Sequence, residues 1–242
     1  MKKFILTVAI CAATAFGSMA QSIFNSDDNK RRLGVEVSYD LQSPSSAKVS
    51  MQNVKMSYDM FDAGSGFSVG AFYQIPIFMN LYIEPRAELF YHTSKFDKGF
   101  LKGMSEDETL PFKGGSLRET GLNIPILAGY HFDFDFISLR VRTFTGPVFS
   151  LGFKGKFHYS TKVSDIDMSG SEGCYEDGGI NRGNVSWRFG AGVDWKDKYR
   201  LSIFGDIGMT NALNNVIAED GNHKVKSNMY RNTIGFALGY LF

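Results

Sequence analysis

The stretch Asn184–Thr210, NVSWRFGAGVDWKDKYRLSIFGDIGMT, consists of two alternating segments separated by a short charged turn, Lys196–Lys198. In the first segment every second residue is apolar: Val185, Trp187, Phe189, Ala191, Val193 and Trp195. In the second, the alternation sets Leu201, Ile203 and Ile207 against Arg200, Ser202 and Asp206. A repeat of two residues over this length predicts a β-hairpin in which each strand has one uniformly apolar face.

The same alternation occurs along the whole chain after its first thirty or so residues. The predicted strands are 33–42, 66–77, 81–93, 117–132, 136–153, 184–195, 199–210 and 229–242. The connections alternate between short ones, at 78–80, 131–135 and 196–198, and long polar ones, at 43–65, 94–116, 154–183 and 211–228. Transmembrane barrels have this rhythm, with tight periplasmic turns and long extracellular loops. We therefore predict an all-β fold, an eight-stranded antiparallel up-and-down transmembrane β-barrel.

Alternation alone does not separate a soluble barrel, whose apolar face lines the interior, from a membrane barrel, whose apolar face meets lipid. Aromatic residues near the strand ends favour the membrane barrel. Trp187 and Trp195 lie on one apolar face, and their spacing along a tilted strand is roughly 20 Å of membrane height. This height matches the band between two aromatic girdles. We expect the girdle to include Trp187, Trp195, Tyr199 and Tyr240.

The amino terminus has the organisation of a secretory signal peptide. A positive start at Lys2 precedes an apolar run, Phe4–Phe16, that is too short to be a stable membrane span. Small residues at the −3 and −1 positions predict cleavage between Ala20 and Gln21. A retained anchor helix is the alternative. The predicted organisation is a signal peptide, a short polar segment and an outer-membrane barrel, at residues 1–20, 21–32 and 33–242.

Composition excludes several classes of protein. The formal net charge of +1 over 242 residues gives no general attraction to nucleic acid. No apolar run after residue 20 approaches the length of a spanning helix, which excludes a helical membrane protein. Cys11 falls in the signal peptide and Cys174 remains alone, so neither an internal disulfide nor a cysteine-based metal site can form. Cys174 is either a loop residue without a special role or a site of intermolecular pairing.

Charged side chains gather on the strand face opposite the apolar one, which is the lumen of a membrane barrel. The acidic residues expected inside are Glu36, Asp40, Glu84, Glu88, Glu119, Asp194 and Asp206. The basic residues expected inside are all arginines: Arg86, Arg140, Arg142, Arg188, Arg200 and Arg231. Isolated buried charges are costly, and arginine can bridge several carboxylates, so we predict that ion pairs fill the lumen as a structural plug. The alternative is a selectivity network in a narrow pore.

Three prolines, Pro85, Pro125 and Pro147, lie inside predicted strands. Proline lacks the N–H group that a strand ladder uses, and a closed barrel has no edge at which this loss is harmless. We therefore expect β-bulges at these positions, or strand ends closer than the boundaries given above.

The last strand, Asn232–Phe242, has the sequence NTIGFALGYLF. A barrel without edges requires that this strand pair with the first one. Its alternating apolar residues, ending in Phe, resemble the C-terminal signature of bacterial outer-membrane proteins. The resemblance implies recognition by the barrel assembly machinery through Phe236, Leu238, Tyr240 and Phe242.

Two further stretches, Gly66–Phe96 (GFSVGAFYQIPIFMNLYIEPRAELFYHTSKF) and Leu122–Phe132 (LNIPILAGYHF), resemble the PorT-type outer-membrane β-barrel family of the Bacteroidetes. Ile126 stands where the family pattern usually has Leu. The family's motifs pack strands and have no catalytic content. The resemblance implies an outer-membrane barrel and, from the family's namesake, an accessory role in secretion. The matching residues are Pro85, Glu88, Leu89, Tyr91, Ile124 and Pro125.

Candidate catalytic and metal-binding residues are few. His92 with Ser94 is similar to the residues that outer-membrane lipid deacylases place toward lipid. However, His92 lies an even number of residues from Glu84 on the same predicted strand, so its side chain is expected to point inward with that of Glu84. A Gly-rich loop is either a solvated acidic segment or a Ca²⁺ site, although it has no EF-hand spacing; its acids are Asp165, Asp167, Glu172, Glu176 and Asp177. We therefore predict no catalytic residue, no cofactor and no metal site.

The long loops are expected to hold the binding specificity, because binding residues concentrate on loops carried by a rigid scaffold. Loop 94–116 is rich in apolar residues, and we expect it either to fold over the barrel mouth or to contact a partner protein. The predicted function is an interaction scaffold, accessory to envelope assembly or secretion, whose partners are outer-membrane lipid and an envelope protein. A narrow passive pore is the alternative, and a lipid-modifying enzyme is the third hypothesis.

Overall fold

The structure, a computed structural model, describes residues 32–51, 54–99, 112–134, 138–163, 166–175, 179–213, 216–217 and 224–242. The predicted signal peptide, its cleavage site between Ala20 and Gln21, and nearly all of the polar segment 21–32 lie outside the described residues. The same holds for much of the predicted loops 94–116 and 211–228. Within the described residues, no helix is long and apolar enough to cross a membrane.

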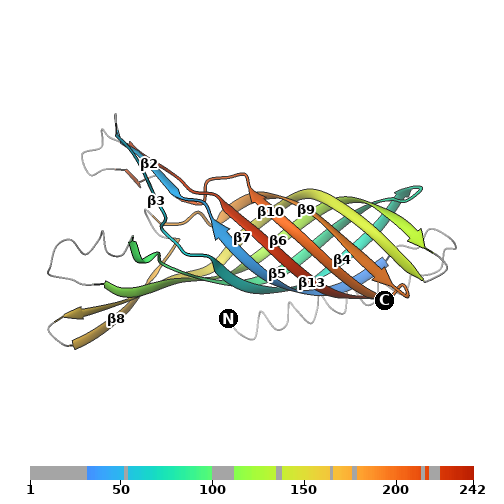
Figure 1. Cartoon of the computed structure of the whole chain (residues 1–242), viewed down its shortest axis with the longest axis horizontal. Helices are drawn as coiled ribbons and strands as arrows, with labels where there is room; N and C mark the ends of the chain where they lie inside the picture. The colour runs from blue at the N-terminus through green and yellow to red at the C-terminus, as the bar shows by residue number, and fades with distance from the viewer. Residues whose placement is uncertain are drawn as a thin grey trace.

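Eight antiparallel strands form a closed ring (Figure 1). They are β1 (Arg32–Pro44), β4 (Gly64–Phe78), β5 (Leu81–Lys95), β6 (Phe112–Phe134), β7 (Leu139–Val163), β9 (Gly183–Trp195), β10 (Tyr199–Gly208) and β13 (Arg231–Leu241). Around the ring the order is β1, β4, β5, β6, β7, β9, β10, β13, so that neighbours in the chain are neighbours in the barrel. The predicted eight-stranded up-and-down barrel is confirmed.

The ring closes between its first and last strands, as the sequence predicted. β1 and β13 pair from Gly34–Leu241 to Pro44–Arg231. One residue further on, the backbone N–H of Phe242 donates a 2.9 Å hydrogen bond to the carbonyl of Leu33. This pairing gives every barrel strand two neighbours, which is the arrangement that a lipid environment requires of β-structure.

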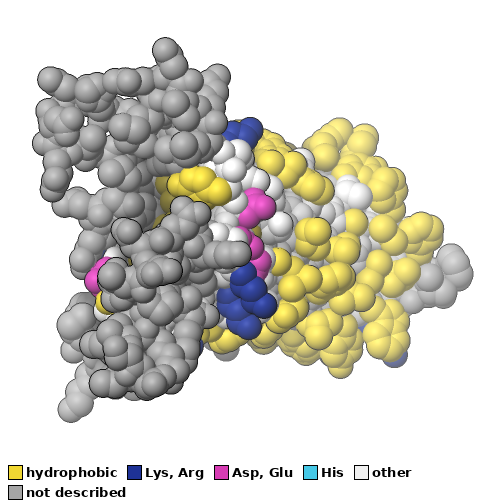
Figure 2. Space-filling view, turned by 60° about the vertical axis from the view of Figure 1, so that its left-hand side comes forward, with side chains coloured by type: hydrophobic (Ala, Val, Ile, Leu, Met, Phe, Trp, Pro, Cys, Tyr) yellow, Lys and Arg dark blue, Asp and Glu magenta, His cyan; other side chains and the backbone are white. Residues whose placement is uncertain are grey.

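The outer surface of the barrel is an apolar belt, and the polar face of each strand points into the lumen. Figure 2 shows this belt as the yellow region covering the barrel. Each strand contributes exposed apolar side chains to it, for example Val37, Phe67, Leu89, Ile126, Phe149, Phe189, Ile203 and Phe236. An exposed apolar area of this extent is stable next to lipid and unfavourable in water.

The strands extend beyond the belt at one end of the barrel, the end that carries the long connections. There β7 continues to Val163 and pairs with β8 (Ile166–Gly173) to form a projecting ribbon (Figure 1). A second, four-stranded sheet contains β2 (Ala47–Met51), β3 (Val54–Tyr58), β11 (Val216–Ile217) and β12 (Lys224–Asn228). The prediction of polar loops at 43–65, 154–183 and 211–228 was therefore wrong in part. Apolar and polar residues do alternate in some of these strands, as in AKVSM of β2 and VKMSY of β3. These strands are shorter than those that cross the membrane, and they lie among polar residues, so their alternation was interpreted as loop.

The prediction of bulges at Pro85, Pro125 and Pro147 was also wrong, because the strand register does not shift at any of them. At each proline one ladder omits two residue pairs and resumes in the same register: β4 with β5 at Pro85, β5 with β6 at Pro125, and β6 with β7 at Pro147. The flanking pairs keep the strands aligned although proline cannot donate a hydrogen bond. A shift occurs instead between Pro76 and Phe78 in β4, beside a short turn.

Inside the barrel, glycines lie opposite aromatic rings of the neighbouring strand. A β-carbon on any of these glycines would approach its partner's ring more closely than packed atoms allow. The missing side chain therefore makes room for each ring in the narrow lumen. The cross-strand pairs are Gly34–Phe72, Gly121–Phe90, Gly129–Tyr82, Gly190–Phe144 and Gly235–Phe204.

Candidate functional site: the lumen and its mouth

The half of the lumen nearer the short turns is filled by a buried cluster centred on Glu84. Its carboxylate lies 2.6 Å from Arg86 and 2.7 Å from Arg200, and Arg142 is 4.0 Å away. Arg200 also forms a two-point contact with Asp194, at 2.8 and 3.0 Å. Arg142 lies 3.2 Å from Asp194 and donates a hydrogen bond to Ser202. Glu84, Arg142 and Arg200 have side chains with no exposed surface, so these charges depend on one another for their stability.

The cluster continues toward the middle of the lumen. Arg86 lies 2.5 Å from Glu36 and 3.6 Å from Glu88. Glu88 in turn lies 2.9 Å from Arg188, which binds Asp206 through two contacts of 2.7 and 3.0 Å. The connected charges, named here the lumen network, are Glu36, Glu84, Arg86, Glu88, Arg142, Arg188, Asp194, Arg200 and Asp206.

Aromatic rings flank the arginines of the lumen network. The guanidinium of Arg188 lies 3.9 Å from the ring centre of Phe204, and that of Arg200 lies 4.1 Å from the ring centre of Phe72. Phe144 lies between Arg86 and Arg142, at 5.4 and 5.0 Å. Cation–π contacts of this kind strengthen when water is excluded. The sequence analysis did not predict these cation–π contacts. The signal that could have indicated them is the occurrence of inward-facing Phe residues opposite inward-facing Gly residues on neighbouring strands.

Above the lumen network lies a separate polar pair, Asp40 and His92, at 3.4 Å. Asp40 also accepts hydrogen bonds from Ser38 at 2.8 Å and from Ser68 at 3.4 Å, and no arginine contacts it among the described residues. The ring of His92 stacks on Phe90. Because His92 is buried inside the barrel, it does not supply the lipid-facing histidine that the deacylase hypothesis needs.

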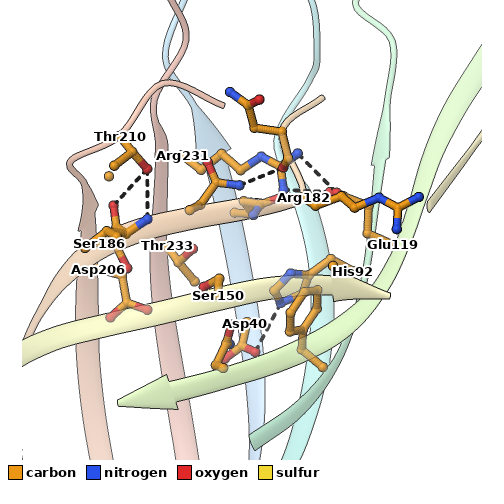
Figure 3. Close-up of a pocket in the computed structure, with 18 of the residues that line it drawn as sticks. Asp40, His92, Glu119, Ser150, Arg182, Ser186, Asp206, Thr210, Arg231 and Thr233 are labelled. Carbon is orange, nitrogen blue, oxygen red and sulfur yellow. Dashed lines mark hydrogen bonds and ion pairs between the residues drawn. The ribbon is translucent and has the colours of Figure 1, made fainter. Parts of the chain in front are cut away.

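At the mouth, where the long connections begin, Glu119 forms the third polar group. Arg231 lies 2.7 Å from its carboxylate, and the hydroxyl of Tyr175 donates to it at 3.0 Å. The guanidinium of Arg182 lies 5.4 Å from the Tyr175 ring centre. Burial and the charge of Glu119 both raise the pKa of the Tyr175 hydroxyl, which therefore stays a hydrogen-bond donor at neutral pH. Figure 3 shows Glu119 and Arg231 above the Asp40–His92 pair.

Between the mouth and the lumen network lies a polar cavity of about 60 Å³. Its volume is enough for a few water molecules. Asp206 and Arg188 belong to both the cavity and the lumen network, so the charges form its floor. The cavity is therefore a small polar chamber that ends at the ion pairs. Its walls include Asp40, His92, Asn123, Asn184 and Thr233.

An apolar cluster, named here the mouth cap, packs over the long-loop end. It is held in place by the segment after β8, in which Cys174 N–H donates to Gly155 O at 3.1 Å and Ile180 N–H donates to Cys174 O at 2.7 Å. Phe96 packs against the cap, as expected if loop 94–116 folds over the mouth, while Phe100, Leu101 and Met104 lie outside the described residues. The cap's buried residues are Ala47, Phe61, Leu117, Cys174, Ile180, Ala212, Leu213 and Met229.

The family model for the outer membrane protein beta-barrel domain matches residues 19–218, which is most of the chain. The chain belongs to this family. Membership, together with the closed ring and its apolar belt, places the protein in the outer membrane. Among curated proteins, no sequence matches the chain.

Several solved outer-membrane proteins are similar in structure to this outer-membrane barrel. Neisserial surface protein A has 13% identity and a TM-score of 0.36, covering 87% of this chain and 97% of its own. Ail, the attachment invasion locus protein of Yersinia pestis, has 10% identity and a TM-score of 0.35, covering 88% and 99%. The translocator domain of the autotransporter NalP from Neisseria meningitidis has 11% identity and a TM-score of 0.38, covering 98% and 96%.

Four of the residues predicted for the lumen lie apart from the lumen network of this outer-membrane barrel: Asp40 and Glu119, described above, and Arg140 and Arg231. Arg140 lies at the short-turn rim, where it contacts Asp133 and, at 3.7 Å, Asp197. Arg231 pairs with Glu119 at the opposite end. Parity predicts which side of the wall a residue faces, but depth along the barrel decides which partners it meets.

The residues predicted for the girdle all have exposed side chains on the outer wall. Trp195, Tyr199 and Tyr240 lie in a row across β9, β10 and β13, with ring centres 6.0 and 5.9 Å apart, and Phe242 extends the row. Trp187 lies further along β9 and donates a 2.7 Å hydrogen bond to Thr145. Phe236 and Leu238 of the predicted assembly signal are also exposed on the outer wall.

In the described part of the chain, no group of three or more His, Cys, Asp or Glu side chains is placed to hold a metal ion. Of the acidic loop considered for calcium, Asp165, Glu176 and Asp177 lie outside the described residues. Glu172 accepts a 3.4 Å hydrogen bond from the hydroxyl of Tyr159.

The thiol of Cys174 is expected to react slowly with maleimide in the folded barrel. Its side chain is fully buried in the mouth cap, and burial together with Glu119 raises its pKa to about 12. At pH 8 the reactive thiolate is therefore scarce. Mass spectrometry should show labelling only after denaturation, while a Lys198→Cys variant with an exposed thiol should label at once. Rapid labelling of the folded wild type, or a disulfide-linked dimer, would instead support intermolecular pairing.

Proposed function

We propose that the protein is a membrane-anchored interaction scaffold with a plugged lumen. The observation that carries this proposal is the combination of a lumen blocked by ion pairs and a mouth closed by apolar packing, above which ordered strands continue. With the long-loop end oriented outward, as in other transmembrane barrels, these strands form an extracellular platform. The proposal assigns the barrel no catalytic activity and no cofactor.

The platform offers a groove of suitable size for a partner. It has a volume of about 680 Å³ and lies beside the β7–β8 ribbon. Its lining combines the rings of Phe96 and Tyr159 with the hydroxyls of Ser169 and Ser171. Apolar rings next to polar groups are typical of protein-binding surfaces. The resemblance to PorT-type barrels supports an envelope protein as partner and an accessory role in assembly or secretion.

A site-specific crosslinking experiment tests the scaffold. A photoreactive side chain at Ser171 of the ribbon is expected to crosslink one envelope protein reproducibly, and the same group at Asp197, at the short-turn end, should not. A matched variant replaces residues 158–171 by Asn-Gly, a two-residue turn that links the paired residues Phe157 and Glu172. This variant should fold and lose the partner in affinity capture. If affinity capture with the wild type recovers only the barrel, as it does with the shortened variant, the result would contradict the scaffold.

The narrow passive pore is the second candidate, because a polar cavity lies in the lumen between the mouth and the lumen network. We expect the wild-type barrel to show no steady conductance in planar bilayers, since the lumen network blocks the path below the cavity. Arg142→Ala should admit a small leak, because it empties a fully buried position within the network. A steady, ion-selective wild-type current that changes its selectivity in this variant would favour the pore.

A further inference from the structure

Four exposed cations cluster on the outer wall at the long-loop end: Lys95 on β5, Arg118 on β6, and Lys154 and Lys156 on β7. We name them the basic patch. Arg118 pairs directly with Lys156 across the two strands, and Lys95 pairs with Ser116, whose other partner is His158. Directly paired residues have α-carbons about 5 Å apart, and alternate residues along a strand are about 7 Å apart. The four charges therefore share one small area.

Among the described residues, no carboxylate forms an ion pair with the basic patch. Like charges placed directly opposite each other destabilise a sheet, yet no ion pair involves Arg118, Lys154 or Lys156 there. Glu119, the neighbour of Arg118, points inward to Arg231. Asp62 donates its backbone N–H to the carbonyl of Lys95, but its carboxylate forms no ion pair with the patch. The surface is therefore complementary to an anion.

The basic patch begins where the apolar belt ends. On β7 the exposed residues Phe149, Leu151 and Phe153 lead directly to Lys154. The register of β6 with β7 shifts at this point: Thr120 pairs with Lys154, but Gly121 pairs with Gly152, which leaves Phe153 unpaired. This bulge turns both Phe153 and Lys154 outward. An aromatic ring in the lipid and an ammonium group just above it define the headgroup level of the membrane.

We propose that the basic patch binds the phosphorylated headgroup of a glycolipid in the outer leaflet. Phosphate accepts several charge-assisted hydrogen bonds, which suits one arginine and several lysines converging on a small area. Continuity with the apolar belt selects a lipid over a soluble anion, since acyl chains then lie along Leu122 and Leu151 of the same strands. The inference rests on the outward orientation of the long-loop end in the proposed function.

Native mass spectrometry of the purified full-length barrel tests the patch. The probes are a bisphosphorylated lipid A and the same lipid without phosphates. Lys154→Gln/Lys156→Gln should weaken binding of the phosphorylated lipid about 25-fold, because each lysine near an anionic surface contributes a factor of about five. Arg118→Gln alone should weaken it about fivefold. The matched control, Lys196→Gln/Lys198→Gln, removes two charges from the short-turn end and should bind like the wild type.

Three outcomes would overturn the site. They are equal binding by the patch variants and the wild type, an equal loss in the control, and wild-type binding of the phosphate-free lipid as tight as that of the phosphorylated one. Competition by inorganic phosphate alone at millimolar concentration would instead indicate a soluble-anion site, which also contradicts a lipid site. Because the measurement uses isolated barrel, it can fail while the ribbon crosslinking succeeds, and the reverse also holds.

Discussion

Replacing Arg200 by Met is expected to lower the free energy of unfolding of the barrel by about 3–5 kcal/mol. Arg200 binds Asp194 through two nitrogens and Glu84 through a third, and all three side chains are essentially inaccessible to solvent. Methionine fills similar space and packs against Phe72, but it leaves the two carboxylates with fewer positive partners. The free energy of unfolding falls mainly because negative charge stays buried without enough positive partners, and less because contacts are lost.

Arg140→Met is the matched control, because it makes the same chemical change at the short-turn rim. Arg140 contacts Asp133 and Asp197, which are partly or largely exposed, so the loss should be at most about 1 kcal/mol. The measurement is a urea titration in lipid vesicles, followed by the difference in electrophoretic mobility between folded and heat-unfolded barrel. Equal destabilisation by the two substitutions would show that the lumen network contributes no more than surface ion pairs do.

The sequence predicted the barrel well wherever lipid and lumen impose opposite demands on alternate residues. β9 and β10 begin within a residue of the predicted positions, because Trp187, Phe189 and Leu201 had to face lipid while Arg188 and Arg200 could not. Beyond the belt this constraint ends. The run from Lys154 to Ser160 still alternates, with Phe157 and Tyr159 on one face, but its polarity resembled that of a loop. That alternation was the signal by which the extension of β7 could have been found.

The alternation of inward and outward residues along a strand could not predict which acid pairs with which arginine inside the lumen. Arg188 and Glu88 are far apart in the chain and meet only because β5 and β9 face each other across the closed ring. Which acid reaches which arginine depends on the stagger of all eight strands, and that stagger follows from the pairing registers. Arg140 and Arg142 share parity, yet one lies at the rim and the other is completely buried. Two residues along a tilted strand are enough to change depth from rim to interior.

The second large effect is expected at Gly190, which lies opposite Phe144 in the pairing of β7 with β9. A β-carbon there would meet the Phe144 ring and would lie 2.6 Å from the backbone carbonyl of Ile203. The carbonyl cannot move without disturbing β10, so the ring must shift. Phe144 supports the guanidinium groups of Arg86 and Arg142, and moving it disturbs the lumen network as well.

Gly190→Val is therefore expected to destabilise the barrel by about 1–3 kcal/mol from overpacking, with a further loss of about 0.5–2 kcal/mol from the displaced cation–π contacts. Gly183→Val is the control on the same strand, since a β-carbon at Gly183 meets nothing within 4 Å. There valine should be neutral or slightly stabilising, because β-branched residues favour strands. The urea midpoints of the two variants should consequently fall on opposite sides of the wild type, or nearly so. If Gly190→Val were tolerated as well as Gly183→Val, the fit of aromatic rings against inward glycines would not limit the packing of this lumen.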